Sequence, residues 1–333
     1  MSISFQEWLD IVQEEYLQEF ISQGGAAVKF LVPLEDKQYD HYGRGLRQAA
    51  EEEGFLFIGV DAATTKIHMM DKLFHEVARQ INWEGLAYRV LTEMIKENGY
   101  EVPSLRSEFN LQTLAALNEV EENLLRKEIN KWLTKRIYKD FNMSQEFRIA
   151  MIQLCLAELE PQTAQSGLRD PIKEWLTGEL SRISTLKAEQ IYQKVGRHNA
   201  RHMFLSLTHW LKSAGSKGLV LCLDISRYTV AKRPRDRDDS FYYSVPALLD
   251  AYEVLRQFID ITDNLENCFI VVIAAPAFIT DDKRGVGRYP ALKMRIWDEV
   301  RDRGRDNPLA PLISVLTCTG ALTAYPMGSF RDV

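Results

Sequence analysis

The chain has 333 residues, 46% of them hydrophobic, and can bury a large core as one α/β domain or as one domain with a helical insertion. Its net charge of -6 argues against a protein that is held on nucleic acid by overall charge alone. No segment has the length and apolarity of a membrane span, and the first residues lack the pattern of a signal peptide. We therefore expect a cytoplasmic protein.

The first part of the chain alternates between helix and strand patterns. Amphipathic residues 4–22 predict a leading helix that stops at Gly24 and Gly25. Apolar runs predict strands over 27–32 and 55–61. Helical spacing predicts three further helices, over 41–53, from caps at Thr64 and Thr65 to Gln80, and from Trp83 to Asn98. This alternation indicates an α/β fold.

Residues 105–195 have a helical pattern almost throughout. Apolar side chains recur there at helical spacing, among them Leu111, Leu114, Leu125 and Ile129. We interpret this segment as an all-helical insertion. The predicted organisation is a first half of an α/β domain over 1–104, the insertion over 105–195 and the second half over 196–333.

The second half contains the strongest strand patterns. Continuous apolar runs predict strands over 218–224, 268–276 and 312–316. Helices are predicted over 199–214 and 245–262. With the two earlier strands these make five, and none shows the polar alternation of a half-exposed sheet. We therefore predict a parallel five-stranded sheet with helices on both faces.

The loop after the first strand has the outline of a phosphate-binding loop. A functional loop of this kind reads G-x-x-x-x-G-K-[ST]: the glycines let backbone N–H groups surround phosphates, the lysine neutralises charge and the hydroxyl holds magnesium. Here Pro33, Gln38, Tyr39 and Asp40 stand at the positions of the two glycines, the lysine and the Ser/Thr. Proline removes a donor and tyrosine removes the cation. The loop therefore predicts a retained fold without catalysis.

Other interpretations of this loop remain open. It could be an ordinary strand–turn–helix connection that never was a phosphate-binding loop. Lys37 could meet an anion, but Glu35 and Asp36 beside it favour a solvated surface lysine. These two carboxylates and Asp40 make the loop acidic, which disfavours a polyphosphate.

Several segments together resemble one known family. They are 24–30, 41–55, 218–224, 274–278 and above all 285–295, Gly-Val-Gly-Arg-Tyr-Pro-Ala-Leu-Lys-Met-Arg. They resemble the ATP-binding proteins of bacteriophage-exclusion (BREX) systems, which are AAA+-like P-loop proteins of bacterial antiviral defence. The resemblance extends over most of 16–100 and 198–316. It implies a P-loop NTPase fold whose loop binds ATP and magnesium.

The sequence departs from this family at three catalytic positions. The family loop ends Gly-Lys-Ser-His-Phe, whereas 38–42 here are Gln-Tyr-Asp-His-Tyr. The family's Walker B strand ends in Asp-Glu, the first acid for magnesium and the second for polarising water; here it ends Asp224-Ile225. A Thr able to sense the γ-phosphate is common after the next strand, and Ala275 stands there. Little room also follows the fifth strand for the family's C-terminal helical lid.

Four further residues are weaker candidates. Asp224 is either a residual metal or polar ligand or, as we favour, a structural carboxylate bonded to a neighbouring loop. The resemblance implies that Arg295 is either an arginine finger toward a neighbouring subunit or the partner of a carboxylate. His198 and His202 could face one metal, but no Cys or Glu stands at a ligand spacing, so we expect surface histidines and no metal site.

Lys131, Lys135, Arg136 and Lys139 form a candidate nucleic-acid patch in the helical insertion, with aromatic residues between them. We favour an interpretation of these four residues without nucleic-acid contact.

These observations predict a non-catalytic AAA+-like subunit, a pseudo-ATPase, of a bacterial antiphage defence system. It acts through contacts with other subunits of a defence complex and needs no cofactor. Two alternatives stay open. One is a defence ATPase with an unorthodox pocket, in which Asp224 holds magnesium and Lys37 or Lys29 supplies charge to ATP. The other is a DNA-binding adaptor that uses the basic helical insertion.

Overall fold

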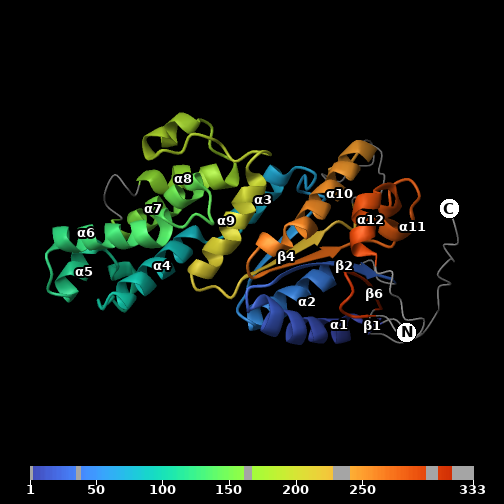
Figure 1. Ribbon diagram of the computed structural model, residues 1–333, viewed down its shortest axis with the longest axis horizontal. Coiled ribbons are helices and arrows are strands. Elements are labelled where there is room, and N and C mark those ends of the chain that lie inside the picture. The colour runs from blue at the N-terminus through green and yellow to red at the C-terminus, as the bar shows by residue number, and fades with distance from the viewer. Residues whose placement is uncertain (1–2, 35–38, 161–166, 228–240, 298–306, 317–333) are drawn as a thin grey trace.

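The computed structural model describes residues 3–34, 39–160, 167–227, 241–297 and 307–316. One sheet of six strands has the order β1-β6-β2-β5-β4-β3, and its paired strands are parallel. The strands are β1 (Ile3–Ser4), β2 (Ala26–Pro33), β3 (Leu56–Asp61), β4 (Leu219–Asp224), β5 (Cys268–Ile273) and β6 (Leu312–Leu316). The sheet lies at one end of an elongated molecule and a layer of helices at the other (Figure 1).

The predicted parallel sheet is confirmed, but the predicted number of five strands is one too few. All five predicted strands are present, and every residue of β5 is buried, as expected for a strand covered on both faces. The sixth strand is β1, whose Ile3 and Ser4 pair with Val315 and Leu316. Two residues are too few to produce a strand pattern in the sequence, and Ser4 also caps the helix that follows.

Helices cover both faces of the sheet. One face carries α1 (Phe5–Ile11), the π-helical segment Val12–Ile21 and α2 (Tyr39–Glu52). The other carries α3 (Met70–Arg79), α9 (Ala200–Ser213), α10 (Val245–Asp260), α11 (Ala277–Thr280) and α12 (Pro290–Ile296), with short 3-10 turns at Thr262–Asn264 and Val286–Arg288. Each set packs on the strands in its own buried apolar cluster. The sheet is therefore the middle of three layers.

Beyond α3 and α9, further helices extend away from the sheet, and we call this group the helical layer (Figure 1). It contains α4 (Trp83–Glu97), α5 (Leu111–Leu117), α6 (Glu122–Leu133), the π-helical segment Thr134–Tyr138, α7 (Gln145–Leu159) and α8 (Arg169–Thr177), with 3-10 turns at Arg106–Glu108 and Ile183–Glu189. α4, which the sequence prediction assigns to the first α/β half, packs along α7. The division of the chain after residues 104 and 195 stays a prediction.

The helix predicted from Thr64 to Gln80 begins later in the structure, at Met70. The reason is a tertiary contact with Tyr243. Its hydroxyl accepts a hydrogen bond from the Ile67 N–H (3.2 Å) and donates to the Thr65 carbonyl (2.6 Å). The second bond uses a carbonyl that a longer helix would need for itself, because it would accept from the N–H four residues on.

The connections that leave the neighbouring strands β2 and β5 run in opposite directions across the sheet. From β2 it crosses one face through α2 to the edge strand β3. It then returns through β4 and β5 to β6, with α3, α9, α10 and α12 on the other face. Opposite directions on opposite faces are what right-handed crossovers require. Sheets of this kind usually bind ligands outside the carboxyl ends of the strands at the reversal, here β2 and β5.

Candidate functional site

The predicted phosphate-binding loop falls at this reversal. β2, β5, β4 and β3 are successive neighbours, so the segments that follow them meet at one edge of the sheet. We call this edge the sheet mouth and define it by Pro33, Tyr39, Asp40, Asp61, Asp224 and Ala275. Lys37 and Gln38 lie outside the described residues.

Pro33 ends β2 inside the sheet rather than in an open loop. It is buried and pairs with Val315 of β6. The next backbone N–H, that of Leu34, donates to the Val315 carbonyl (3.0 Å). Since the proline nitrogen carries no hydrogen and the Leu34 N–H is already bonded, neither nitrogen is available to an anion.

α2 begins at Tyr39, the position that a phosphate-binding lysine would occupy. Tyr39 is partly buried and packs against the apolar cluster that α1 and α2 form with the sheet. Asp40 is exposed in the first helical turn. A carboxylate at that place interacts favourably with the positive end of the helix dipole, and so it takes the electrostatic role that a bound phosphate would have.

Asp61 and Asp224 form a pair of carboxylates at the mouth. They end β3 and β4 and are register partners. Each accepts a hydrogen bond from a backbone N–H two residues on, Asp61 from Ala63 (2.7 Å) and Asp224 from Ser226 (2.8 Å). The sequence analysis named Asp224 alone. The signal for Asp61 was present, because both strands are apolar runs that end in an aspartate.

Burial raises the pKa of the Asp224 carboxyl above its usual value. Hydrogen bonds from Ser226 oppose this rise, and the negative charge of Asp61 adds to it. The next residue, Ile225, is fully buried, and its N–H donates to the Ile273 carbonyl (2.8 Å). Ile225 thus continues the sheet packing at the position where a catalytic acid was expected from the resemblance.

Lys29 lies too far from the mouth to supply charge there. It precedes Pro33 by four strand residues, about 13 Å. Its ammonium group donates to the carbonyls of Leu309 and of Ala310 (3.3 Å), in the segment that enters β6 from the opposite edge. Burial lowers the pKa of Lys29 to about 8. The alternative that used Lys29 for ATP therefore loses this residue.

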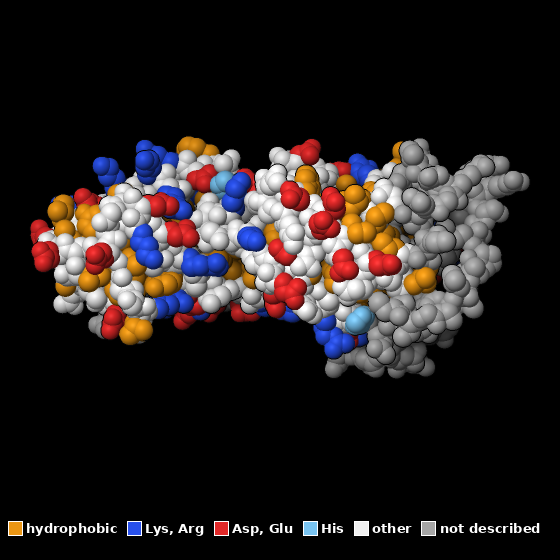
Figure 2. All heavy atoms as spheres, turned by 90° about the horizontal axis from the view of Figure 1, so that it is seen from below, with side chains coloured by type: hydrophobic (Ala, Val, Ile, Leu, Met, Phe, Trp, Pro, Cys, Tyr) orange, Lys and Arg blue, Asp and Glu red, His pale blue; other side chains and the backbone are white. Residues whose placement is uncertain are grey.

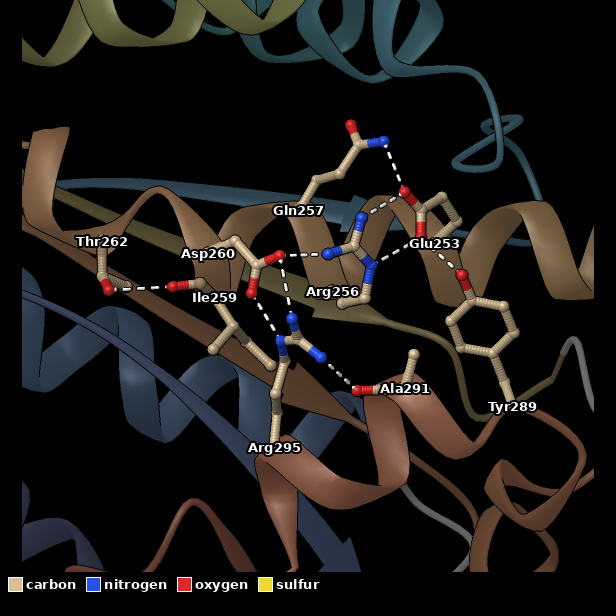
Figure 3. A network of polar contacts seen from close by, with 9 residues as sticks. All are labelled: Glu253, Arg256, Gln257, Ile259, Asp260, Thr262, Tyr289, Ala291 and Arg295. Atoms are coloured by element: carbon tan, nitrogen blue, oxygen red, sulfur yellow. Dashed lines mark hydrogen bonds and ion pairs between the residues drawn. The ribbon is translucent and has the colours of Figure 1, made fainter.

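Arg295 pairs with a carboxylate of its own chain (Figure 3). Its Nε and Nη2 donate to the two oxygens of Asp260 (2.5 and 3.2 Å), and its Nη1 donates to the Ala291 carbonyl (2.7 Å). Asp260 also bonds Arg256, which holds Glu253 in turn. The network fastens α12 to α10. A role of Arg295 toward a neighbouring subunit stays a prediction.

The basic residues of the helical layer do not act as one group. Lys131, Lys135 and Lys139 are exposed and form no ion pair with any described residue. Arg136 instead pairs with Glu97 of α4 (2.8 Å). On the face shown in Figure 2, acidic side chains are interspersed with basic ones over the helical half. The helical half therefore shows no continuous basic surface on this face, and Arg136 is paired with an acid.

The predicted histidine pair does not share a helix. His198 precedes α9 and bonds the Gln193 side chain (3.0 Å), whereas His202 lies exposed on α9. Within the described ranges, no group of three or more His, Cys, Asp or Glu residues is placed to hold a metal ion.

His209, further along α9, joins three separate segments. Its Nε2 lies 2.6 Å from Asp140 and its Nδ1 lies 2.9 Å from Glu266, which also pairs with Lys212 (2.9 Å). Because both ring nitrogens face carboxylates, this arrangement stabilises the protonated ring, in which both nitrogens donate. Burial lowers the pKa of His209, but the hydrogen bonds and charges of Glu266 and Asp140 outweigh it, and the pKa is raised.

The family model of the BREX system ATP-binding protein BrxC/D matches residues 19–320. The chain belongs to the BREX ATP-binding family. No curated protein and no solved structure matches it. The BREX match includes β2 to β6 and the whole helical layer, so the resemblance found in the sequence is confirmed, and the parallel sheet flanked by helices is consistent with a P-loop NTPase-like fold. Family membership makes the chain a component of BREX antiphage defence.

The BREX family name implies ATP, and the described residues of the mouth fit a triphosphate poorly. A phosphate cradle needs several free backbone N–H groups and a lysine. Pro33 lacks the N–H, and the charged side chains that define the mouth, Asp40, Asp61 and Asp224, are acids. The exposed Arg227 carries the opposite charge, which acts on Asp224. In the described part of the chain, no helix has the length and apolarity to cross a membrane.

Proposed function

We propose that this BREX family member is a non-catalytic subunit, a pseudo-ATPase that keeps the ATP-binding fold and acts through contacts with other subunits of a defence complex. The observation that supports this proposal is the sheet mouth. Its proline is bonded into the sheet, its tyrosine is packed on the core, and its three aspartates bring negative charge to this end of the sheet.

Simple electrostatics gives the size of the loss in phosphate binding energy. Two unit charges about 4 Å apart near a protein surface interact by about 4 kcal/mol. A lysine attracts the terminal phosphates by an amount of this order, and the aspartate that stands at the neighbouring Ser/Thr position repels them. The exchange of Lys-Ser for Tyr39-Asp40 therefore removes several kcal/mol of phosphate binding.

Calorimetric titration of the purified chain with ATP and magnesium tests the proposal. We expect no saturable heat, and no release of phosphate in a parallel assay. Micromolar binding accompanied by turnover would overturn the proposal. The measurement is made first on the chain alone and then on the complete BREX complex. Phosphate release that occurs only in the complex is then assigned to another subunit.

One observation favours a second candidate, an ATPase with an unorthodox pocket. Asp61 and Asp224 are adjacent carboxylates, and magnesium in nucleotide sites is commonly held by one or two carboxylates and the phosphates. This candidate expects nucleotide binding that is lost in Asp61→Ala and Asp224→Ala. Asp282→Ala, at an exposed site of the second half, is the matched control.

Exposed apolar side chains on the helical layer support a role in subunit contacts. Leu105, Leu117 and Leu124 are all exposed around α5 and α6. In cells that carry the complete BREX system, we expect the tagged chain to co-purify other BREX subunits, and Leu117→Ser with Leu124→Ser to reduce their amount. Phe20→Ser, an exposed site at the sheet end, is the control. Purification of the chain alone from such cells would contradict a subunit role.

The DNA-binding alternative depends on the three exposed lysines of the helical layer. It predicts a gel shift that weakens steeply with salt and that Lys131→Glu, Lys135→Glu and Lys139→Glu abolish together. Absence of a shift even at low salt would end this alternative.

A further inference from the structure

Two exposed aromatic rings lie where the π-helical segment Thr134–Tyr138 ends. Tyr138 is the last residue of this segment, and Phe141 lies in the turn that leads to α7. Their exposed fractions are 44% and 81%. Single exposed apolar side chains are common on protein surfaces, but two rings on one surface form a patch that is typical of an interaction site.

Arg148 of α7 holds the two rings together. Its guanidinium group lies over the ring of Phe141, 4.9 Å from the centroid, and over the ring of Tyr138, 5.7 Å from the centroid. Its Nη1 also donates to the Tyr138 carbonyl. Arg148 itself is only 8% exposed. Each ring thus lies against a buried cation and keeps exposed surface for a flat partner, and we call these three residues the aromatic platform.

Hydrogen bonds fix the turn that carries Phe141. One carboxylate oxygen of Asp140 accepts from the backbone N–H of Asn142 (3.2 Å), and the other lies 2.6 Å from His209 of α9. Ser144 ends the turn and caps α7, because its hydroxyl accepts from the Phe147 N–H (3.3 Å). A surface that is ordered before a ligand arrives loses little conformational entropy on binding.

Three lysines lie on the segment that carries the platform. Lys135 and Lys139 stand three residues before and one residue after Tyr138, and Lys131 lies about one helical turn before Lys135. All three are exposed and form no ion pair with a described residue. Apart from Arg136, which Glu97 pairs, four basic and two acidic residues lie between 131 and 148. This segment is therefore positive in a chain of net charge -6.

The residue types favour a nucleic acid over a protein as the partner. Aromatic rings serve both, but lysine is depleted in protein interfaces and is a common contact of phosphate groups. Bases stack on aromatic side chains in proteins that bind single strands, whereas the bases of a duplex are already stacked on one another. Stacking and phosphate contacts need no 2′-hydroxyl, so they suit DNA.

We propose that this surface binds single-stranded DNA, whose bases stack on Tyr138 and Phe141 while Lys131, Lys135 and Lys139 contact its phosphates. The surface is separate from the sheet mouth, so the proposal does not depend on whether the chain binds ATP. It gives the DNA-binding alternative a strand type and a stacking surface.

Fluorescence anisotropy of a labelled oligo-dT strand of about 15 nucleotides, titrated with the full chain, tests the proposal. We expect saturable binding, at least about tenfold tighter than that of a duplex of the same length. Three phosphate contacts at about -0.7 each predict a slope of about -2 for the logarithm of the binding constant against that of the salt concentration. Equal binding of the duplex, or no binding of the single strand at low salt, would overturn the proposal. A uridine strand that binds at least about tenfold tighter would contradict the assignment to DNA.

Two variants separate stacking from charge. Phe141→Ala removes an exposed ring without removing charge, so we expect about 5- to 150-fold weaker binding with an unchanged salt slope. Lys135→Gln with Lys139→Gln removes two charges, so binding weakens and the slope becomes shallower by about 1.4. Phe20→Ala, which removes an exposed ring at the sheet end, is the matched control and keeps full binding. Phe141→Trp keeps a stacking ring and should bind as the wild type does.

Three results would contradict the aromatic platform as a DNA site. The first is unchanged single-strand binding in Phe141→Ala. The second is duplex binding that the lysine variant weakens and Phe141→Ala does not, which would leave only the DNA-binding alternative. The third is loss of other BREX subunits from co-purification in Phe141→Ala when no single strand binds, which would make the surface a protein interface.

Discussion

Replacing Asp224 with asparagine separates a structural carboxylate from a metal ligand. Burial and the Asp61 charge raise the pKa of Asp224, so the folded chain binds its proton more tightly than the unfolded chain. The contribution of this carboxyl to the free energy of unfolding therefore falls as pH rises from its unfolded pKa through its folded pKa. Above the folded pKa this contribution is fully lost. Asparagine lacks this charge and can still accept from the Ser226 N–H. We expect Asp224→Asn to be more stable at pH 7 by about 1 kcal/mol.

Thermal unfolding at pH 7 and near pH 4 measures this difference. The gain in Tm should be present at pH 7 and shrink near pH 4, where the wild-type carboxyl becomes neutral. Asp263→Asn, at an exposed site, should change neither value. A lower Tm of Asp224→Asn at pH 7 would contradict this expectation, and a magnesium-induced rise in Tm that this variant loses would show that Asp224 holds a metal.

Restoring two residues of the loop should not restore catalysis. In Tyr39→Lys with Asp40→Ser, the cation and the hydroxyl return, but Pro33 still lacks its N–H and Ile225 still occupies the place of the acid that polarises water. We expect phosphate release from ATP to stay at the wild-type background. Hydrolysis clearly above that background would mean that the rest of the mouth is competent.

The mouth shows what sequence can and cannot reveal about a site. The losses at Tyr39 and Asp40 follow from residue types alone, because lysine chemistry has no substitute in tyrosine. The pairing of Asp61 with Asp224 depends on strand register, and the remoteness of Lys29 depends on which edge of the sheet its side chain meets. Neither register nor edge is encoded in a local pattern.

At the scale of elements, long apolar runs predicted β2 to β6 correctly because both faces of a parallel strand are buried. The helices over 83–98 and 199–214 were also predicted to within a residue or so, as strong helical periodicity allows. The predicted start of α3 was wrong because Tyr243, far away in sequence, forms a hydrogen bond with the segment before this helix. Such tertiary contacts override local caps.

The His209 cluster joins α9 to the loop after the second π-helical segment and to the segment before β5, and its strength should depend on pH. The pKa of His209 is raised in the folded chain. The contribution of the His209 charge to stability is therefore fully present below the unfolded pKa near 6.5 and is lost as pH rises through the folded pKa. We expect His209→Gln to lower stability by about 1 kcal/mol at pH 6, an amount reduced by partial solvent screening.

Chemical denaturation at pH 6 and pH 9 checks this expectation. The difference between the wild type and His209→Gln should narrow at pH 9. The exposed His202→Gln should show no difference at either pH. A difference that is the same at pH 6 and pH 9 would show that the charge of the ring contributes nothing and that the ring stabilises by packing alone.

At the scale of the whole molecule, one buried apolar cluster includes residues of both the sheet and the helical layer. Phe204 of α9 is buried in this cluster, with ring centroids 5.3 Å from Phe74 of α3 and 5.2 Å from Phe258 of α10. We expect a single calorimetric unfolding transition, and Phe204→Ala should destabilise it by about 3–5 kcal/mol. The exposed Phe20→Ala is the control. Two transitions, of which Phe204→Ala shifts only one, would instead support the predicted division at 104 and 195.

β6 lies between β2 and β1, although it follows every other strand in the sequence. During synthesis β2 therefore has both edges unpaired until β5 is made, and one edge unpaired until the segment around Leu312 has left the ribosome. At bacterial elongation rates this interval lasts roughly 15–60 s. An unpaired apolar edge recruits other nascent chains. Production of this protein in the cell should accordingly depend on chaperones that shield a growing chain, more than for a fold whose strands pair in the order of their translation.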